Sequence, residues 1–292
     1  MYAVVQTFAS GVLMGGIYGV IAAGLALIYG VMRIINFAHG ELVMIGMFVA
    51  FWCWQLFGLD PYISMIPAGI ALFIIGYVLQ KGLINPALKR TIEREPLIII
   101  LITVGLSMIL INGGVLLWTD YPKMLHTSYG LSSVTIGMIR LPVSRIISFF
   151  LSIAIIVALY FVLSKTELGM QMRATSQDRE AARLMGINEP HTYCIAFAIG
   201  AAVAGMSGAM LTPIFFITPS VGHVFIMKSF IIVVLGGMGS VLGALAGGLI
   251  VGLMESVGSQ FVNPVYAEVS VFILFILVLL ARPSGLLGRE RI

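Results

Sequence analysis

The chain has 292 residues, of which 60% are hydrophobic and only 10% are charged, and its mean hydropathy is +1.09. This composition excludes an ordinary soluble domain and indicates a protein that crosses a membrane several times. We therefore expect membrane lipid around the chain. The formal net charge is only +4, so we expect no nucleic-acid partner. The expected fold class is an all-α polytopic membrane protein with a single transmembrane domain over residues 1–292.

Apolar runs follow one another along the chain, and crossing a bilayer as a helix takes about 20 such residues. We therefore expect about eight spans, some of them broken or re-entrant, with a polar loop at 119–142. The runs cover residues 3–32, 42–57, 62–79, 97–118, 143–163, 193–211, 224–255 and 265–281.

The distribution of lysine and arginine predicts which segments lie in the cytoplasm, because cytoplasmic loops are enriched in them. Twelve of the sixteen basic residues lie at Arg33, in 81–94, in 164–192 and in the tail 282–292, so we place these segments inside. Lys123, Arg140, Arg145 and Lys228 are then expected outside.

Two apolar regions are interrupted, the first at residues 33–41 (R-I-I-N-F-A-H-G-E) and the second at 236–239 (G-G-M-G). The predicted topology makes residues 224–255 enter and leave on the outer side. They are too few for two comfortable spans, so we expect a broken or re-entrant pair that turns at 236–239. Residues 1–100 and 212–292 both have the order helix, break, helix, which predicts a weak internal repeat with a pathway at its interface.

The side chains at these breaks are candidates for a gate or pathway lining, because ionisable groups at membrane depth are costly and usually functional. If the first break is helical, Asn36, His39 and Gly40 share one face. The alternative is a cytoplasmic turn in which Glu41 is the anion at a helix N-terminus. Glu255 and Glu268 are expected at the outer ends of spans. The candidate gate residues are Asn36, Phe37, His39, Gly40, Glu41, Gly236, Gly237 and Gly239.

Small residues recur at every fourth position in three of the runs, a pattern that allows helix backbones to approach closely in lipid. We favour packing inside the subunit over a contact with another subunit. The residues are Gly11, Gly15 and Gly19, then Gly200, Ala204 and Gly208, then Gly239, Gly243 and Gly247.

The longest strongly polar stretch, residues 165–191, lies between two spans. Thr175 and Asp178 form a T-x-x-D start signal and Gly186 can end a helix, which predicts one short helix of about ten residues at 175–186. Such a helix is suited to docking a soluble partner, and a solvated connecting loop is the alternative. The candidate coupling residues are Arg173, Thr175, Asp178, Glu180, Ala181, Ala182, Arg183, Leu184 and Gly186.

Motifs for catalysis are missing from the sequence. Nothing matches G-x-x-x-x-G-K-[ST], the four histidines are scattered, and no nucleophile triad or metal-ligand spacing occurs. We therefore expect a non-catalytic chain that binds no metal and no cofactor of its own.

Three motifs closely resemble the LivH-type permease of branched-chain amino acid ABC importers. They are G-L-A-L-I-Y-G-V at 24–31 followed by I-N-F-A-H-G-E at 35–41, the segment 173–188 containing A-A-R-L-M-G-I-N, and L-G-G-M-G-S-V-L-G-A at 235–244. They occur in the order found in that family, and the resemblance covers essentially the whole chain.

The resemblance implies the permease subunit of an importer in the bacterial inner membrane, which moves branched-chain or other hydrophobic amino acids by alternating access. Its partners would be a second permease of the LivM type, two cytoplasmic ATPases of the LivG and LivF types that hold ATP and Mg, and a periplasmic solute-binding protein. The helix at 175–186 would dock on an ATPase, and the loop at 119–142 would help to receive the binding protein.

We expect a mostly apolar pathway, with specificity set by the binding protein. The alternative functions are an importer permease for urea or short amides, a proton-coupled carrier with His39 and Glu41 as the relay, and a scaffold subunit.

Overall fold

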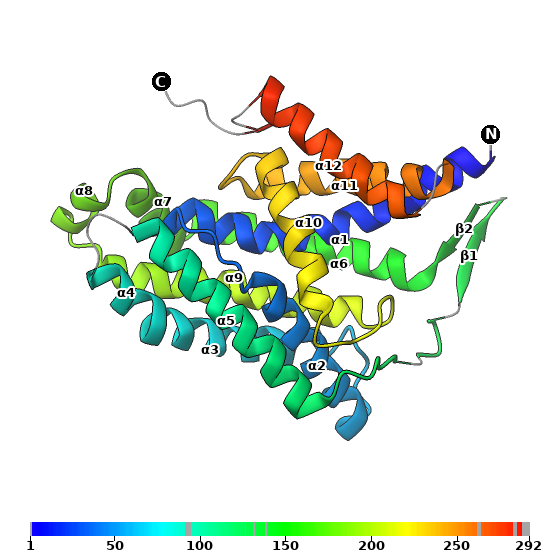
Figure 1. Ribbon diagram of the computed structural model, residues 1–292, viewed down its shortest axis with the longest axis horizontal. Helices are drawn as coiled ribbons and strands as arrows, with labels where there is room; N and C mark the ends of the chain where they lie inside the picture. Colours follow the sequence, from blue (N-terminus) through cyan, green and yellow to red (C-terminus); the bar gives the residue numbers. More distant parts are fainter. Residues whose placement is uncertain are drawn as a thin grey trace.

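The computed structural model describes residues 2–90, 95–125, 127–130, 132–137, 139–261, 264–282 and 285–287 (Figure 1). Parts of two segments that were placed in the cytoplasm, residues 91–94 together with 283–284 and 288–292, lie outside the described residues, as does His126.

The described chain is almost entirely helical, which confirms the predicted fold class. Seven of its helices are long and apolar enough to cross a bilayer, and α10 and α12 are shorter apolar helices. The helices are α1 (Tyr2–Met32), α2 (His39–Phe57), α3 (Met65–Leu79), the π-helical turn η1 (Gln80–Ile84), α4 (Asn85–Arg90), α5 (Glu95–Trp118), α6 (Val143–Lys165), α7 (Glu167–Gln177), α8 (Arg179–Leu184), α9 (Glu189–Leu211), α10 (Val221–Gly236), α11 (Val241–Phe261) and α12 (Pro264–Ala281).

The expected polar loop at 119–142 contains a feature that we did not predict. Its strands β1 (Ser133–Ile136) and β2 (Ile139–Pro142) pair antiparallel, with Ile136 opposite Ile139. Gly137 opens the connecting turn at a φ of +63°, a conformation that glycine adopts readily. The hairpin leads directly into α6.

Helix α1 is the axis of the bundle. In an apolar stretch of 18 residues, 89% of α1 is buried, whereas only 28% of the corresponding stretch of α6 is buried. Helix α11 runs antiparallel along it, and α6, α9 and α10 also pack against it (Figure 1). Burial on all sides explains why the sequence of α1 has no polar face.

Glycine allows α1 and α11 to approach closely. A Cβ atom added to Gly15 of α1 would lie only 2.7 Å from the Gly248 oxygen of α11, and one added to Gly252 would lie 2.5 Å from the Gly11 oxygen. Gly19 faces the same helix. The glycine stripe of α1 therefore packs inside the subunit, which confirms the interpretation favoured from the sequence.

The two ends of the bundle are different (Figure 1). At one end, here called the α8 end, α7 and α8 lie beside the last turn of α1, and Arg33 Nη2 donates to the Ser176 oxygen at 3.0 Å. At the opposite end, here called the hairpin end, the Arg140 amide donates to Gln6 Oε1 of α1 at 2.8 Å. Helix α1 therefore extends from one end of the molecule to the other.

The interrupted run at 224–255 forms the helical pair α10 and α11, whose turn lies at the α8 end, where Gly239 contacts Gly30 of α1. Gly239 has a φ of +92°, which explains a glycine at this close approach. The pair turns where we predicted. We expected too few residues here for two full spans. This is true only of α10, because α11 has 21 residues and is long enough to cross a bilayer. Helix α10 begins inside the bundle, where Gly222 lies against Gly40.

Candidate functional site

The first break is a reversal of the chain inside the bundle. Helix α1 ends at Met32, Arg33 has a φ of +57°, and α2 does not begin until His39. The His39 Nε2 atom lies 3.0 Å from the carbonyl oxygen of Ile21. Ile21 precedes the end of α1 by roughly 16 Å of helix at 1.5 Å per residue. Helix α2 therefore starts deep inside the protein rather than at its end.

Three polar side chains of this break, Asn36, His39 and Glu41, are fully buried. Asn36 Oδ1 accepts from the Ala38 amide at 3.0 Å, and its carbonyl accepts from the His39 amide, so Asn36 forms the turn that starts α2. Asn36 is not helical, so the condition under which Asn36, His39 and Gly40 would share a helical face is not met. The cytoplasmic turn stays a prediction, and Glu41 does lie in the first turn of α2, as that alternative requires.

The break packs directly against the first turn of α10. A Cβ atom on Gly40 would overlap the Gly222 carbonyl, lying 2.8 Å from its carbon, so glycine is required at this crossing. Ser107 of α5 and His223 of α10 lie within interaction range of the Glu41 carboxyl. Within the described residues, neither Glu41 oxygen has a hydrogen-bond partner. Phe37 is half-buried beside these groups.

The second break lies at the other end of α10. Gly236 and Gly237 are buried and Gly239 is exposed, and the amide of Leu287 donates to the Gly236 oxygen at 3.0 Å. The candidate gate residues therefore form two groups instead of one site. Helix α10 connects them, with its first turn on Gly40 and its last turn at Gly236.

The polar segment forms two helices, not the single one predicted. Thr166 caps α7 by accepting from the Gly169 amide at 3.2 Å, and Asp178 caps α8 by accepting from the Glu180 and Ala181 amides at 2.9 and 3.0 Å. Thr175 is not a start signal, because it is buried in α7 and its hydroxyl donates to the Gln171 oxygen. The chain re-enters the extended region at Asp178, and α8 begins there.

Gly186 ends this segment as expected, with a φ of +85°. Asn188 then caps α9 by accepting from the His191 amide at 3.2 Å, and Pro190 occupies the first turn of that helix. Proline is well tolerated at a helix start, so α9 begins at Glu189 and not near Tyr193 as predicted.

Helices α7 and α8 are each joined to the end of α1 by one arginine hydrogen bond. Arg179 Nη2 donates to the Met32 oxygen at 3.1 Å, and Arg33 Nη2 donates to the Ser176 oxygen at 3.0 Å. Arg183 forms an ion pair with Glu189 at 2.5 Å, which joins α8 to α9. Helices α7 and α8 are therefore both anchored at the chain segment where α1 ends and the first break begins.

The outer surface of α8 is apolar at its tip. Leu184 and Met185 are 88% and 82% exposed, whereas Ala182 is buried at 3%. Exposed large apolar side chains at the end of a polar segment indicate a contact surface. The candidate coupling residues that are exposed are Arg173, Asp178, Glu180, Ala181, Arg183, Leu184 and Gly186, and the buried ones are Thr175 and Ala182.

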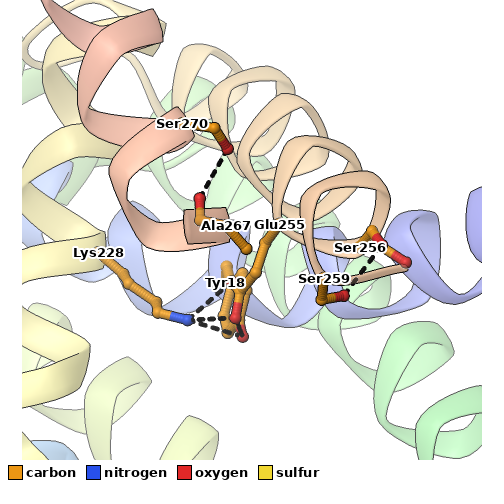
Figure 2. A network of polar contacts seen from close by, with 7 residues as sticks. All are labelled: Tyr18, Lys228, Glu255, Ser256, Ser259, Ala267 and Ser270. Atoms are coloured by element: carbon orange, nitrogen blue, oxygen red, sulfur yellow. Dashed lines mark hydrogen bonds and ion pairs between the residues drawn. The ribbon is translucent and has the colours of Figure 1, made fainter. Parts of the chain in front are cut away.

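Sequence reasoning missed a charged cluster inside the bundle, which Figure 2 shows. Lys228 Nζ of α10 lies 2.7 Å from both carboxylate oxygens of Glu255 on α11, and 3.2 Å from the Tyr18 hydroxyl of α1. Tyr18 is the middle residue of the apolar span Val4–Met32. The expected positions, Lys228 outside and Glu255 near the outer end of a span, stay predictions. The ion pair between them was not predicted.

The loop before the hairpin is held by aromatic side chains. The Tyr129 hydroxyl donates to Asp60 Oδ2 at 2.6 Å, and the Tyr62 hydroxyl donates to the Ser144 oxygen at 2.8 Å. Burial and the hydrogen bond to Asp60 raise the pKa of Tyr129 well above its ordinary value. The hairpin end therefore presents a fixed surface.

Sequence comparisons with known proteins cover almost the whole chain. The family model described as "Branched-chain amino acid transport system / permease component" matches residues 7–281. The high-affinity branched-chain amino acid transport system permease protein BraD of Pseudomonas aeruginosa is 33% identical over 100% of this chain and 98% of its own length. The corresponding permease protein LivH of Escherichia coli (strain K12) is 31% identical over 100% of this chain and 97% of its own.

A third relative extends the comparison. The probable branched-chain amino acid transport permease protein LivH of Methanocaldococcus jannaschii is 31% identical over 92% of this chain and 87% of its own length. No solved structure matches the chain.

Proposed function

The chain belongs to the permease family of branched-chain amino acid transport systems, and on this premise we propose that it is the transmembrane permease subunit of an ATP-binding cassette importer. It moves branched-chain or other hydrophobic amino acids inward across the bacterial inner membrane by alternating access. The names of its relatives as permease proteins of such transport systems support the substrate class.

The subunit catalyses no reaction itself. Two cytoplasmic ATPases of the LivG and LivF types bind ATP and Mg and supply the energy, a second permease of the LivM type completes the pathway, and a periplasmic binding protein delivers the solute. The resemblance of the motifs supports these partners, and the enrichment of Lys and Arg at the α8 end supports a cytoplasmic location for that end. The hairpin end then faces the periplasm and receives the binding protein.

The observation that carries the proposal is the connection between α8 and the first break. The exposed tip of α8, Leu184 and Met185, docks on an ATPase, and Arg33 and Arg179 transmit the movement to the end of α1. The reversal that follows α1 contains buried polar groups and no regular backbone, which is tolerated in a membrane only inside protein or beside a cavity. It is therefore suited to change shape between the inward and outward states.

The gate in this account has two parts. The buried group around His39 and Glu41 closes the pathway in the middle of the membrane, and the glycines at 236–239 allow the turn between α10 and α11 to move at the cytoplasmic side. The two breaks lie at the two ends of α10, and they belong to the repeat-like parts that we propose, residues 1–100 and 212–292.

Docking is tested by a change at the tip of α8. Leu184→Glu combined with Met185→Glu replaces the two exposed apolar side chains, and we expect the purified permease to lose its co-purifying ATPases and cells to lose ATP-dependent leucine uptake. The matched control is Met170→Glu on α7, which is 58% exposed but lies in the preceding helix. Normal uptake and normal ATPase recovery in the double variant would show that α8 is not the docking element.

A further inference from the structure

A cavity of about 210 Å³ lies between α10, α11 and α12, beside the charged cluster of Figure 2. Its lining contains Lys228, Glu255 and Glu268 together with aliphatic and aromatic side chains that include Val224, Ile231 and Phe272. A single water needs roughly 10–15 Å³ of such space. The cavity therefore has the size for a small organic molecule.

The charges in this lining lie at membrane depth. The Lys228 ammonium and the Glu255 carboxylate meet the hydroxyl of Tyr18, which is the middle residue of an apolar span. Their side chains are nevertheless 15% and 28% exposed, and both line the cavity. Charged groups exposed to lipid at this depth cost several kcal/mol, so they normally face a water-filled path or a partner.

We propose that this cavity is a solute-binding site on the translocation pathway that takes an aliphatic α-amino acid in its zwitterionic form. The inference rests on the proposed function and adds where, and by which groups, the solute is held. The solute carboxylate pairs with Lys228, its ammonium pairs with Glu255 and Glu268, and its aliphatic side chain lies against the apolar part of the lining. This site differs from the mostly apolar pathway that the sequence led us to expect.

The lining offers charges of both signs to the two ends of a zwitterion. Lys228 and Glu255 pair with each other at 2.7 Å, and Glu268 is a further carboxylate in the same lining. Lys228 now donates to both oxygens of Glu255 and to Tyr18. When one of these bonds opens, the solute carboxylate takes the freed N–H, while Glu268 adds a second carboxylate for the ammonium.

The preference for an aliphatic side chain follows from the apolar part of the lining. Val224, Ile231 and Phe272 present carbon surface, and Val224 is 47% exposed. Burying aliphatic groups there is favourable by about 25 cal/mol per Å². A polar side chain would gain nothing on this surface and would lose its hydration.

The test uses the complete importer in proteoliposomes with its binding protein, L-leucine as the probe, and ATP hydrolysis measured in parallel. The double variant Lys228→Gln/Glu255→Gln removes both charges and leaves neither unpaired. We expect leucine uptake to fall at least about tenfold, the effect of losing one charge-assisted hydrogen bond, while hydrolysis stimulated by the loaded binding protein continues. Loss of transport with retained hydrolysis separates a solute contact from a structural contact.

A second variant does not depend on the ion pair. Val224→Phe fills the cavity from an exposed position, and we expect a severalfold loss of leucine uptake without a change in the melting temperature. The controls are Ser259→Ala in α11 and Ser270→Ala in α12, two helices that also line the cavity. The hydroxyls of these serines donate to the Ser256 and Ala267 oxygens (Figure 2). Both controls should transport normally.

The outcomes distinguish a failure of the solute site from a failure of the proposed function. Wild-type leucine uptake in either the double variant or Val224→Phe would overturn the solute site and leave the proposed function in place. A wild-type importer that takes up no leucine with ATP and binding protein would overturn the proposed function, and the site would fall with it.

Discussion

Replacing Gly252 by alanine tests the central packing contact of the bundle. Gly252 of α11 faces α1, and an added Cβ would lie 2.5 Å from the Gly11 oxygen and closer still to the Cα of Gly15. Ordinary contacts between carbon atoms are about 3.5–4.0 Å long. Helix α11 must therefore move away from α1 by about 1 Å, and the change is felt along the most extensive helix contact of the molecule.

The size of the effect follows from two opposing contributions. Overpacking at a tight contact costs typically 1–3 kcal/mol, and the absence of a flexible neighbour at Gly252 places it near the upper end. The substitution also gains about 0.5–1 kcal/mol because alanine is a better helix former than glycine. The net loss is about 2 kcal/mol, which corresponds to a fall in melting temperature of roughly 4–8 °C.

The matched control is Gly113→Ala in α5, where an added Cβ meets nothing within 4 Å. Only the gain in helix propensity applies there, so the melting temperature should stay the same or rise. Both variants are measured by the thermal loss of monodisperse protein in detergent. Equal melting temperatures for the two alanine variants would refute the argument that glycine sets the distance between α1 and α11.

Two other predictions concern the ends of the bundle. At the α8 end, Arg179→Ala removes the hydrogen bond to the Met32 oxygen. We expect ATP hydrolysis to continue while leucine uptake falls several-fold. A proportional fall of the two activities would contradict this role of Arg179. At the hairpin end, the raised pKa of Tyr129 means that its neutral phenol stabilises the fold below about pH 10, and that this contribution is lost as the pH rises through the folded pKa. The melting temperature of Tyr129→Phe should therefore lie below the wild type at pH 8 and approach it above pH 10, and a gap that does not change with pH would contradict this.

The spans were predictable because each depends on a local property, an apolar run of sufficient length. The starts of helices were less predictable. Thr175 and Asp178 both fit a start signal, and only the tertiary structure decides between them, by burying Thr175 inside α7 and leaving Asp178 free to cap α8. The start of α9 was missed because the apolar run begins near Tyr193, whereas the helix begins four residues earlier with Pro190 in its first turn.

The first break was predictable as a polar interruption, but its depth was not. Nothing local shows that His39 reaches back to Ile21, because that contact depends on the chain reversing at Arg33. The separation of the gate residues into two groups likewise follows from the position of α10 in the bundle.

The charged cluster could not be found from spacing, because Lys228 and Glu255 lie on different helices 27 residues apart. A signal was nevertheless present. Each is a charged residue within the apolar run 224–255, which was predicted to form a broken or re-entrant pair. Lys228 lies 8 residues before Gly236 and Glu255 lies 16 residues after Gly239, so their spacing about the turn does not identify the ion pair.

The most direct test of the account is leucine uptake into proteoliposomes that contain the chain with its ATPases and second permease. We predict uptake only when ATP is available to the ATPases and the loaded binding protein is on the opposite side, and no uptake by the chain alone. Uptake by the chain alone, driven by an ion gradient without ATP, would contradict the account and identify the protein as a secondary carrier.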